Sequence, residues 1–189
     1  MYVVFEGIDG SGKTTQIPLV KEILVNWKIN RDLYKLDVLE IAETEITEDE
    51  LKTNFPNREL VFKYALQRLE NQSMIESNKN NIILSDRSYI SSIAYQGLAR
   101  NSEWVRDVNK YMIEPDLVVF LKTNPQSAYL ELVQQNYEEI LDSFSFDYIT
   151  INTANIDISE TAYKIFQEIS GMWETFFEKD YEEDAYGDS

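Results

Sequence analysis

A glycine-rich run near the start of the sequence has the composition of a phosphate-binding loop. Residues 7–14 read Gly-Ile-Asp-Gly-Ser-Gly-Lys-Thr, which fits the pattern G-x-x-x-x-G-K-T. Glycines let the backbone fold tightly, so that successive N–H groups converge on phosphate oxygens, and the N-terminus of a following helix attracts the same anion. The lysine of such a loop reaches the β- and γ-phosphates, and the next hydroxyl holds Mg²⁺. The residues expected to bind ATP are Gly7, Asp9, Gly10, Ser11, Gly12, Lys13, Thr14 and Thr15, with Thr14 also binding Mg²⁺.

A second charged motif follows another apolar run. Residues 82–85 read Ile-Ile-Leu-Ser, which is typical of a buried strand, and Asp86, Arg87 and Ser88 come directly after it. In an open α/β sheet, ligands bind at the carboxyl ends of the strands. An aspartate there reaches the Mg²⁺ shell or the acceptor, and an arginine clamps a phosphate with two hydrogen bonds. The alternative is an ion pair on the surface, which the phosphate loop elsewhere in the chain makes the weaker explanation.

The composition narrows the chemistry further. The chain has 189 residues, a net charge of −17, and neither cysteine nor histidine. It therefore has no disulfide, no thiolate nucleophile and no histidine base or ligand. Such an acidic surface repels nucleic-acid polymers and anionic membranes, so the few basic residues must gather around any anionic ligand. The first residues lack the pattern of a signal peptide and no apolar run approaches the roughly 18 residues of a membrane span, so we expect a cytoplasmic protein.

The elements that must position the two motifs alternate between strand and helix. Short apolar runs indicate strands at residues 2–6, within 32–39, and at 82–85, 117–121 and 148–152. Apolar spacing and capping residues indicate helices at 13–28, from 56–57 onward, at 89–97 and 102–113, from 124–125 onward, and from 157 to about 177. This order indicates an α/β fold around a parallel sheet with helices on both faces. We expect a single domain over residues 1–178 and an acidic, disordered tail over 179–189.

Longer blocks of the sequence resemble the thymidylate kinase family. The blocks are residues 5–16, 86–97 and 115–121, in the family's order, and residues 64–68 resemble its aromatic…Arg helix segment. Arg100 matches the basic residue that often follows the Ala-Tyr-Gln-Gly block at 94–97. The resemblance spans most of the chain and implies a P-loop NTPase-type fold with a short lid. It also implies Mg²⁺-dependent transfer of the ATP γ-phosphoryl group to a deoxynucleoside monophosphate, with dTMP as the expected acceptor, by a homodimer.

The resemblance also implies roles for individual side chains. Tyr64 would stack on the acceptor base and Arg68 would hydrogen-bond to it. Asp9 would meet the deoxyribose 3′-hydroxyl. Arg87 would hold the acceptor phosphate, with Asp86 beside the metal.

Three further residues near position 95 belong to the same implied site. Tyr95 would crowd the 2′ position and so favour deoxyribose, Gln96 would lie near the base edge, and Ser92 would contribute there. A structural explanation exists for several of these residues. Tyr64 and Tyr95 also suit the apolar face of a helix, and Arg68 also suits a solvated helix surface.

Two departures from the family pattern concern positive charge. The family's Arg-Glu-Pro-Gly-Gly segment after the second strand is missing, and Lys35 is the only cation within residues 33–45. Residues 123–163 contain no Lys or Arg, and the phosphate loop has no arginine at 9–11. An arginine that stabilises the transferring phosphoryl group contributes roughly 10³–10⁵ in rate. We expect Arg100 to supply that charge, which gives Lys13, Asp86, Arg87 and Arg100 as the catalytic set.

Other functions stay open from the sequence alone. A deoxynucleoside kinase would explain the missing acceptor-phosphate arginine, and another or modified pyrimidine deoxynucleotide would explain the altered segment at 33–45. A catalytically weak nucleotide-binding protein, acting as a sensor or assembly partner, would explain the arginine-free lid. An acceptor assay with Mg-ATP separates these hypotheses.

Overall fold

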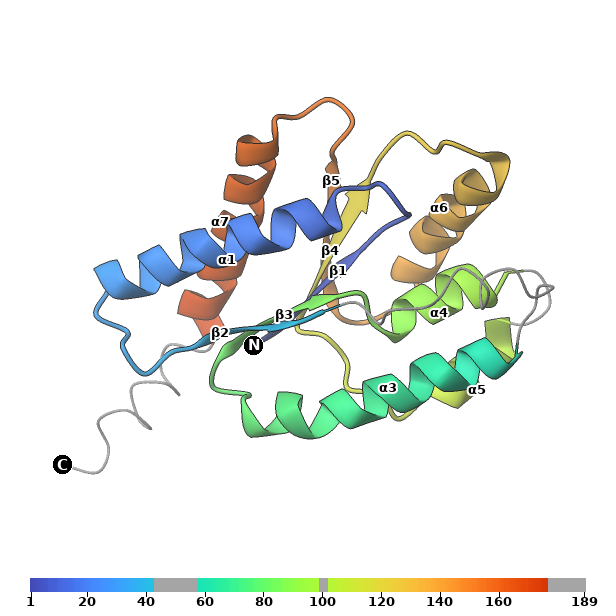
Figure 1. Cartoon of the computed structure of the whole chain (residues 1–189), viewed down its shortest axis with the longest axis horizontal. Coiled ribbons are helices and arrows are strands. Elements are labelled where there is room, and N and C mark those ends of the chain that lie inside the picture. Colours follow the sequence, from blue (N-terminus) through green and yellow to red (C-terminus); the bar gives the residue numbers. More distant parts are fainter. Residues whose placement is uncertain (43–57, 99–101, 177–189) are drawn as a thin grey trace.

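The computed structural model describes residues 1–42, 58–98 and 102–176, and within them five parallel strands form one sheet. The strand order is β2-β3-β1-β4-β5, so β1 lies at the centre (Figure 1). The strands are β1 (Tyr2–Glu6), β2 (Val38–Ile41), β3 (Ile82–Asp86), β4 (Leu117–Lys122) and β5 (Asp147–Asn152). The predicted parallel α/β sheet is therefore confirmed.

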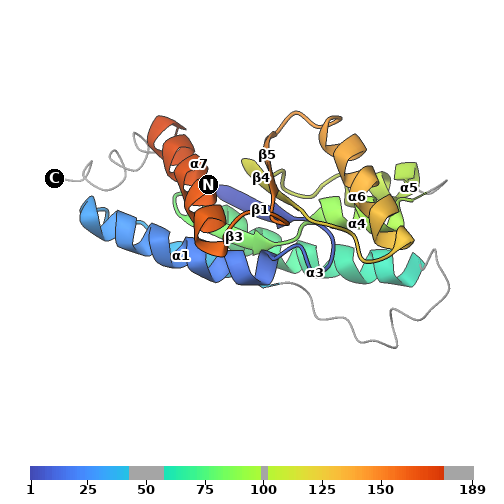
Figure 2. The same cartoon turned by 90° about the horizontal axis from the view of Figure 1, so that it is seen from above.

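Helices cover both faces of this sheet, as Figures 1 and 2 show. The long helices α1 (Lys13–Asn30) and α7 (Ile158–Phe176) pack together over one face. The opposite face carries α3 (Arg58–Ser77), α4 (Tyr89–Gln96), α5 (Ser102–Asn109) and α6 (Ala128–Leu141). None of the helices in the described ranges combines the length and hydropathy that a membrane crossing requires.

The side chains of β1 explain why the strand lies in the middle. Val3 and Phe5 point into the core beneath α1 and α7, whereas Val4 belongs to the cluster on the other face. All three are fully buried. A strand buried on both faces must be apolar throughout, which is why the run from residue 2 to 5 has no polar position. Strand β1 therefore delivers the phosphate loop to the centre of the sheet edge.

Three predicted elements differ from the structure by three residues or more at one end. The second strand begins at Val38 and reaches Ile41, because Leu33 and Leu36 are buried in the turn that precedes it. The turn begins where Leu33 N–H donates to the Lys28 carbonyl (2.9 Å) and Asp32 adopts a positive φ of 59°. Helix α5 ends at Asn109, four residues earlier than predicted.

Helix α6 begins at Ala128, later than the predicted start at 124–125. The Ser127 hydroxyl accepts a hydrogen bond from Leu130 N–H (3.2 Å) and caps the helix. The cap predicted for the last helix is confirmed, since the Asp157 carboxylate accepts from Ser159 N–H (2.8 Å). Asparagine and serine are both good caps, and the structure begins α6 after Ser127 rather than after Asn124.

Candidate active site

The phosphate loop joins β1 to α1 at the centre of the sheet edge. Gly7 has a φ of +143°, and a Cβ there would come within 2.4 Å of the Leu121 carbonyl oxygen. Gly12 has a φ of +97° and forms the N-cap of α1. Ser11 N–H donates to the Ile8 carbonyl (3.1 Å), which closes the loop. The chain therefore forms the tight turn that the glycine spacing predicted.

Lys13 places its ammonium group inside this loop. Its Nζ donates to the carbonyl oxygens of Gly7 (3.0 Å) and Ile8 (3.1 Å), and the residue is only 5% exposed. Thr14 and Thr15, by contrast, are exposed on the first turn of α1. Because the first N–H groups of a helix have no partner within it, this turn offers donors and a favourable dipole to an anion. The loop thus combines a buried cation with exposed hydroxyls.

Arg87 follows β3 and reaches across to the phosphate loop. Its Nη1 donates to the Gly7 carbonyl (2.9 Å), and its Nη2 forms an ion pair with the Asp9 carboxylate. The guanidinium carbon lies 5.1 Å from the Tyr95 ring centroid. Tyr95 itself accepts from Asp9 N–H through its hydroxyl (3.1 Å). The two sequence motifs therefore meet in space, because β3 pairs directly with β1.

A buried carboxylate lies beneath this contact. Glu6, the last residue of β1, is fully buried and accepts hydrogen bonds from Ser88 N–H (2.8 Å) and the Ser88 hydroxyl (2.8 Å). Its other oxygen accepts from the hydroxyls of Ser91 (2.5 Å) and Tyr137 (2.9 Å). Four hydrogen bonds satisfy a charge that would otherwise be costly to bury.

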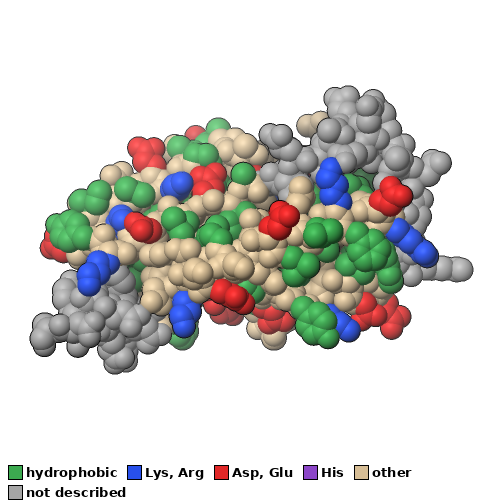
Figure 3. Space-filling view, turned by 60° about the horizontal axis from the view of Figure 1, so that its bottom comes forward, with side chains coloured by type: hydrophobic (Ala, Val, Ile, Leu, Met, Phe, Trp, Pro, Cys, Tyr) green, Lys and Arg blue, Asp and Glu red, His purple; other side chains and the backbone are tan. Residues whose placement is uncertain are grey.

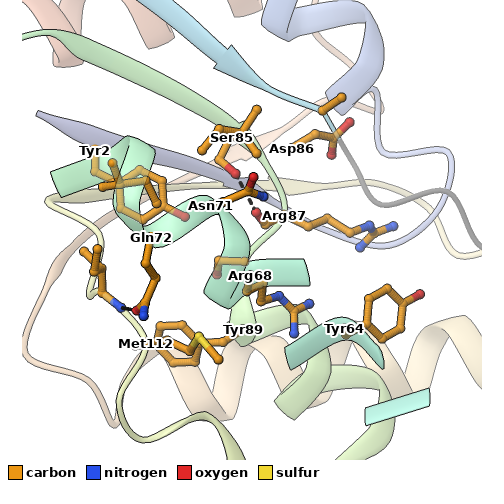
Figure 4. A pocket seen from close by; sticks show the side chains of 15 residues that line it. Tyr2, Tyr64, Arg68, Asn71, Gln72, Ser85, Asp86, Arg87, Tyr89 and Met112 are labelled. Atoms are coloured by element: carbon orange, nitrogen blue, oxygen red, sulfur yellow. Dashed lines mark hydrogen bonds between the residues drawn. The ribbon is translucent and has the colours of Figure 1, made fainter. Parts of the chain in front are cut away.

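A pocket lies beside the two motifs. It is partly open to solvent and lies between α3, the end of β3 and the segment after α5 (Figure 4). Its lining includes the charged side chains of Arg68, Asp86 and Arg87 and the apolar side chains of Ile75 and Ile113. The remaining lining residues are Tyr2, Ile41, Ala42, Tyr64, Asn71, Gln72, Ser85, Ser88, Tyr89 and Met112.

Arg68 supplies positive charge to this pocket from α3. Its Nη1 donates to the Ser92 hydroxyl (2.7 Å), and its guanidinium carbon lies 5.1 Å from the Tyr64 ring centroid. Burial lowers the pKa of Arg68 to about 10, and the nearby Glu6 carboxylate opposes that effect. Arg68 is therefore still charged at neutral pH. With Arg87, it gives the pocket two cations that face one ligand volume.

The predicted acceptor residues divide into two groups. Tyr64, Arg68 and Arg87 line the pocket together. Ser92 lies behind Arg68 and reaches the pocket only through its hydrogen bond to that residue. Tyr95 lies on the other side of Arg87, beside Asp9.

The remaining predicted residues lie apart from the pocket lining or outside the described ranges. Gln96 is buried at 9% exposure near the end of α4. Lys35 is exposed in the turn before β2. Arg100, residues 43–57 and the acidic tail at 179–189 lie outside the described residues.

The oxygen ligands available at the loop suit Mg²⁺. Thr14 offers a hydroxyl and Asp86 offers a carboxylate, and both are hard oxygen donors of the kind Mg²⁺ prefers. No group of three or more acidic residues that could hold a metal occurs within 1–42, 58–98 and 102–176. Mg²⁺ does not need one, since it binds through one or two protein oxygens together with water and substrate phosphates.

Three residues of the site were missed by reasoning from the sequence. Glu6, Ser91 and Tyr137 share hydrogen bonds around Arg87, and Tyr137 comes from α6, 131 positions after Glu6. One local signal pointed to Glu6, which is a charged residue at the end of an otherwise apolar strand. Nothing in the sequence around Tyr137 distinguishes it from an ordinary core tyrosine.

Comparison with known proteins places the chain in a family. The family model described as thymidylate kinase matches residues 5–154. A probable thymidylate kinase from Methanobrevibacter smithii is 30% identical over 91% of this chain and 97% of its own length. Another from Methanocaldococcus jannaschii is 32% identical over 87% of this chain and 93% of its own length.

The solved structures include a similar fold. The crystal structure of thymidylate kinase from Ehrlichia chaffeensis superimposes with a TM-score of 0.69 at 25% identity, covering 89% of this chain and 98% of that one. The matching model spans most of the sequence and includes both motifs of the site. The chain therefore belongs to the thymidylate kinase family.

Proposed function

We propose that this site transfers the γ-phosphoryl group of ATP to dTMP and releases ADP and dTDP. A phosphate oxygen of dTMP attacks the γ-phosphorus, the bond to the β–γ bridging oxygen breaks, and ADP leaves with that electron pair. A nucleotide phosphate is already an anionic nucleophile, so the reaction needs no strong base, which suits a chain without histidine. The observation that carries the proposal is the meeting of the phosphate loop with Arg87, beside a pocket that also holds Arg68.

On the donor side, the loop residues would bind the ATP phosphates. Lys13 would move from the carbonyls of Gly7 and Ile8 to the β- and γ-phosphates. Thr14 and Asp86 would hold Mg²⁺. An ion held by these two side chains would neutralise charge on the ATP phosphates.

On the acceptor side, the pocket would take dTMP with its phosphate toward Arg87. Tyr64 would stack on the thymine, and Arg68 would hydrogen-bond to it, with Ser92 holding the guanidinium in place. Asp9 and Tyr95 lie beside each other at the loop. Asp9 would receive the 3′-hydroxyl of the sugar while Tyr95 restricts space at the 2′ position, and Gln96 would contribute near the base edge.

Arg100 completes the proposed catalytic set. Lys122 is the only cation between residues 111 and 163, and its ammonium group forms an ion pair with Glu138. Helix α6 therefore brings no arginine toward the transferring phosphate. Arg100 follows the block at 94–97, which matches the family, and it is the residue best placed in the sequence to stabilise the transition state.

An acceptor screen with Mg-ATP tests the proposed reaction. We expect ADP formation with dTMP, and little with thymidine or with ribonucleoside monophosphates. Lys13→Met serves as the matched inactive control, because it keeps the length of the side chain and removes its charge. Turnover with thymidine alone would instead support a deoxynucleoside kinase. ATP binding without turnover of any acceptor would support a sensor or assembly protein.

We also propose that the enzyme is a homodimer that uses the face formed by α3 and α5. Phe62, Leu66 and Leu69 lie at helical spacing on α3 and are 47–60% exposed. Trp104 of α5 packs edge-on against Phe62 at 5.7 Å between ring centroids. Figure 3 shows hydrophobic side chains gathered on this face of the molecule. Clustered apolar side chains of this kind favour association between copies.

Because ATP and deoxynucleotides meet in the cytoplasm, we also propose that the enzyme acts there.

A further inference from the structure

The two terminal nitrogens of the Arg87 guanidinium have different kinds of partner. Its Nη1 donates to the Gly7 carbonyl (2.9 Å) and lies 3.3 Å from the hydroxyl oxygens of both Ser91 and Tyr137. Its Nη2 pairs with Asp9, a residue whose side chain is 69% exposed. The Arg87 side chain itself is only 9% exposed. One nitrogen therefore has three buried partners, and the other has a partner at the protein surface.

The Glu6 carboxylate orients the Ser91 and Tyr137 hydroxyls relative to Arg87. Ser91 and Tyr137 both lie within hydrogen-bond distance of one Glu6 oxygen, at 2.5 Å and 2.9 Å. An ionised carboxylate can only accept, so each hydroxyl donates its hydrogen to Glu6. The oxygen lone pairs of both hydroxyls are then left to accept from Arg87 Nη1. Burial raises the pKa of Tyr137 well above its usual value, so its hydroxyl remains a donor at neutral pH.

The backbone conformation of Arg87 explains why its side chain needs contacts at the guanidinium. Arg87 has a φ of +70°, in the left-handed region that non-glycine residues rarely occupy. Arg87 N–H donates to the Phe5 carbonyl (3.0 Å), and the Ser85 hydroxyl donates to the Arg87 carbonyl (2.8 Å). This geometry directs the side chain from the end of β3 back over the phosphate loop. Contacts at Nη1 then fix the position of the guanidinium at the end of this long side chain.

We infer that Tyr137 and Ser91 are positioning residues that fix Nη1 of Arg87, so that Nη2 can leave Asp9 for the phosphate of the acceptor. Tyr137 acts from α6, a helix that carries no cation of its own. The Glu6 hydrogen-bond network, made of Glu6, Ser88, Ser91 and Tyr137, thus links α6 to the acceptor phosphate through Arg87. The inference rests on the proposed function and names residues that act on its acceptor step.

Comparing the binding of dTMP and thymidine tests this role. Tyr137→Phe removes the hydroxyl and keeps the ring, which packs on Phe120 with 5.4 Å between centroids. We expect the Kd of dTMP to rise about fivefold to tenfold, because a hydrogen bond to a charged group is lost. The Kd of thymidine, which has no phosphate, should change by less than about twofold on the same scale. Tyr148→Phe is the matched control. Tyr148 lies on the edge strand β5, and its hydroxyl also bonds to a carboxylate, that of Asp142.

A second comparison tests whether the effect passes through Arg87. Tyr137→Phe in an Arg87→Ala background should add no further loss of dTMP binding. Equal losses for dTMP and thymidine, or an unchanged Kd for both, would overturn the inference. If Tyr137→Phe does not fold, Ser91→Ala makes the same test, because Ser91 contacts the same nitrogen. A wild-type chain that binds no dTMP would overturn the proposed function first, and the inference with it.

Discussion

Gly7 shows how closely the phosphate loop fits its surroundings at the scale of one residue. Its φ of +143° is accessible to glycine, and the space that a Cβ would fill is already occupied by the Leu121 carbonyl oxygen at 2.4 Å. That carbonyl belongs to β4, so the loop is limited by a neighbouring strand as well as by its own turn. A side chain at position 7 would therefore disturb both the loop and the sheet.

Gly7→Ala should destabilise the protein by about 3 kcal/mol and weaken ATP binding. The matched control is Gly171→Ala within α7, where no atom lies within 4 Å of the added carbon. That change should stabilise the protein by about 0.5–1 kcal/mol, because alanine favours the helix. Denaturant unfolding of the two variants measures both effects. Equal stability of the two variants would contradict this account of Gly7.

Arg100→Ala should lower kcat by at least about a hundredfold, because the transferring phosphoryl group would lose a stabilising charge. The KM for ATP should change much less, since the loop and Lys13, and not Arg100, form the proposed donor site. Steady-state kinetics with dTMP measures the effect. Arg106→Ala is a suitable control, because Arg106 is a cation close to Arg100 in the sequence and its side chain bonds to Ser143. An unchanged kcat in Arg100→Ala would remove that residue from the mechanism.

Site residues that lie close together in the sequence were predicted, and a contact between residues far apart in the sequence was missed. Gly7 to Thr14 are contiguous, so their spacing alone indicates a loop and its ligand. Asp86 and Arg87 needed only one further rule, that ligands gather at the ends of parallel strands. The contact between Tyr137 and Glu6 depends on how α6 packs over β1, and no spacing along the chain expresses that.

Elements were predicted by their apolar periodicity, and their ends were decided by hydrogen bonds. Strands β1, β3 and β4 are continuous apolar runs and were placed within one residue at each end. Strand β2 was misplaced because Leu33 and Leu36 look like strand residues and are core residues of a turn. The start of α6 was misplaced because Asn124-Pro125 and Ser127 both resemble helix starts. Tertiary packing selects between such alternatives.

Ser127→Ala should lower the free energy of unfolding by about 1 kcal/mol, because the Leu130 N–H loses its acceptor at the start of α6. Asn124→Ala should have a smaller effect, since α6 does not begin there. Chemical denaturation of both variants checks the difference. A larger loss for Asn124→Ala would mean that α6 is capped earlier than the structure shows.

At the scale of the whole molecule, the apolar face on α3 should control assembly. Leu66→Glu places a charge beside Phe62 and Leu69 on the proposed interface, so we expect the variant to sediment as a monomer and the wild type as a dimer. Leu132→Glu is the matched control, because Leu132 is 56% exposed on α6, away from this face. Sedimentation equilibrium measures both. A dimeric Leu66→Glu variant would exclude this face as the interface.

Alkaline unfolding should depend on buried tyrosines. Burial raises the pKa of Tyr2 to about 12 and raises the pKa values of Tyr89, Tyr95 and Tyr137 above their ordinary value. The stability that these neutral phenols provide is complete below about pH 10 and is lost as the pH rises through their folded pKa values. Burial lowers the pKa of Arg68 to about 10, so the contribution of this group to stability rises with pH. Arg68 is a single group, and the four tyrosines have the larger combined effect.

The measurement is the absorbance of tyrosinate alongside circular dichroism across the alkaline range. The buried tyrosines should ionise in the same step in which helical signal disappears. The control is the chain in denaturant, where tyrosines titrate near pH 10. Gradual ionisation of all tyrosines while the helices persist would contradict the burial of these four phenols.

The central position of β1 also has a consequence for synthesis of the protein. Tyr2 pairs with Ile83, and Val3 pairs with Leu117. Strand β1 can therefore join the sheet only after β3 and β4, which are translated much later. Contacts this distant in sequence are slow to form and leave early segments unprotected. The Leu121 carbonyl that borders Gly7 comes from the later of these partners. A nascent chain on the ribosome should therefore acquire nucleotide affinity only after β4 has left the exit tunnel.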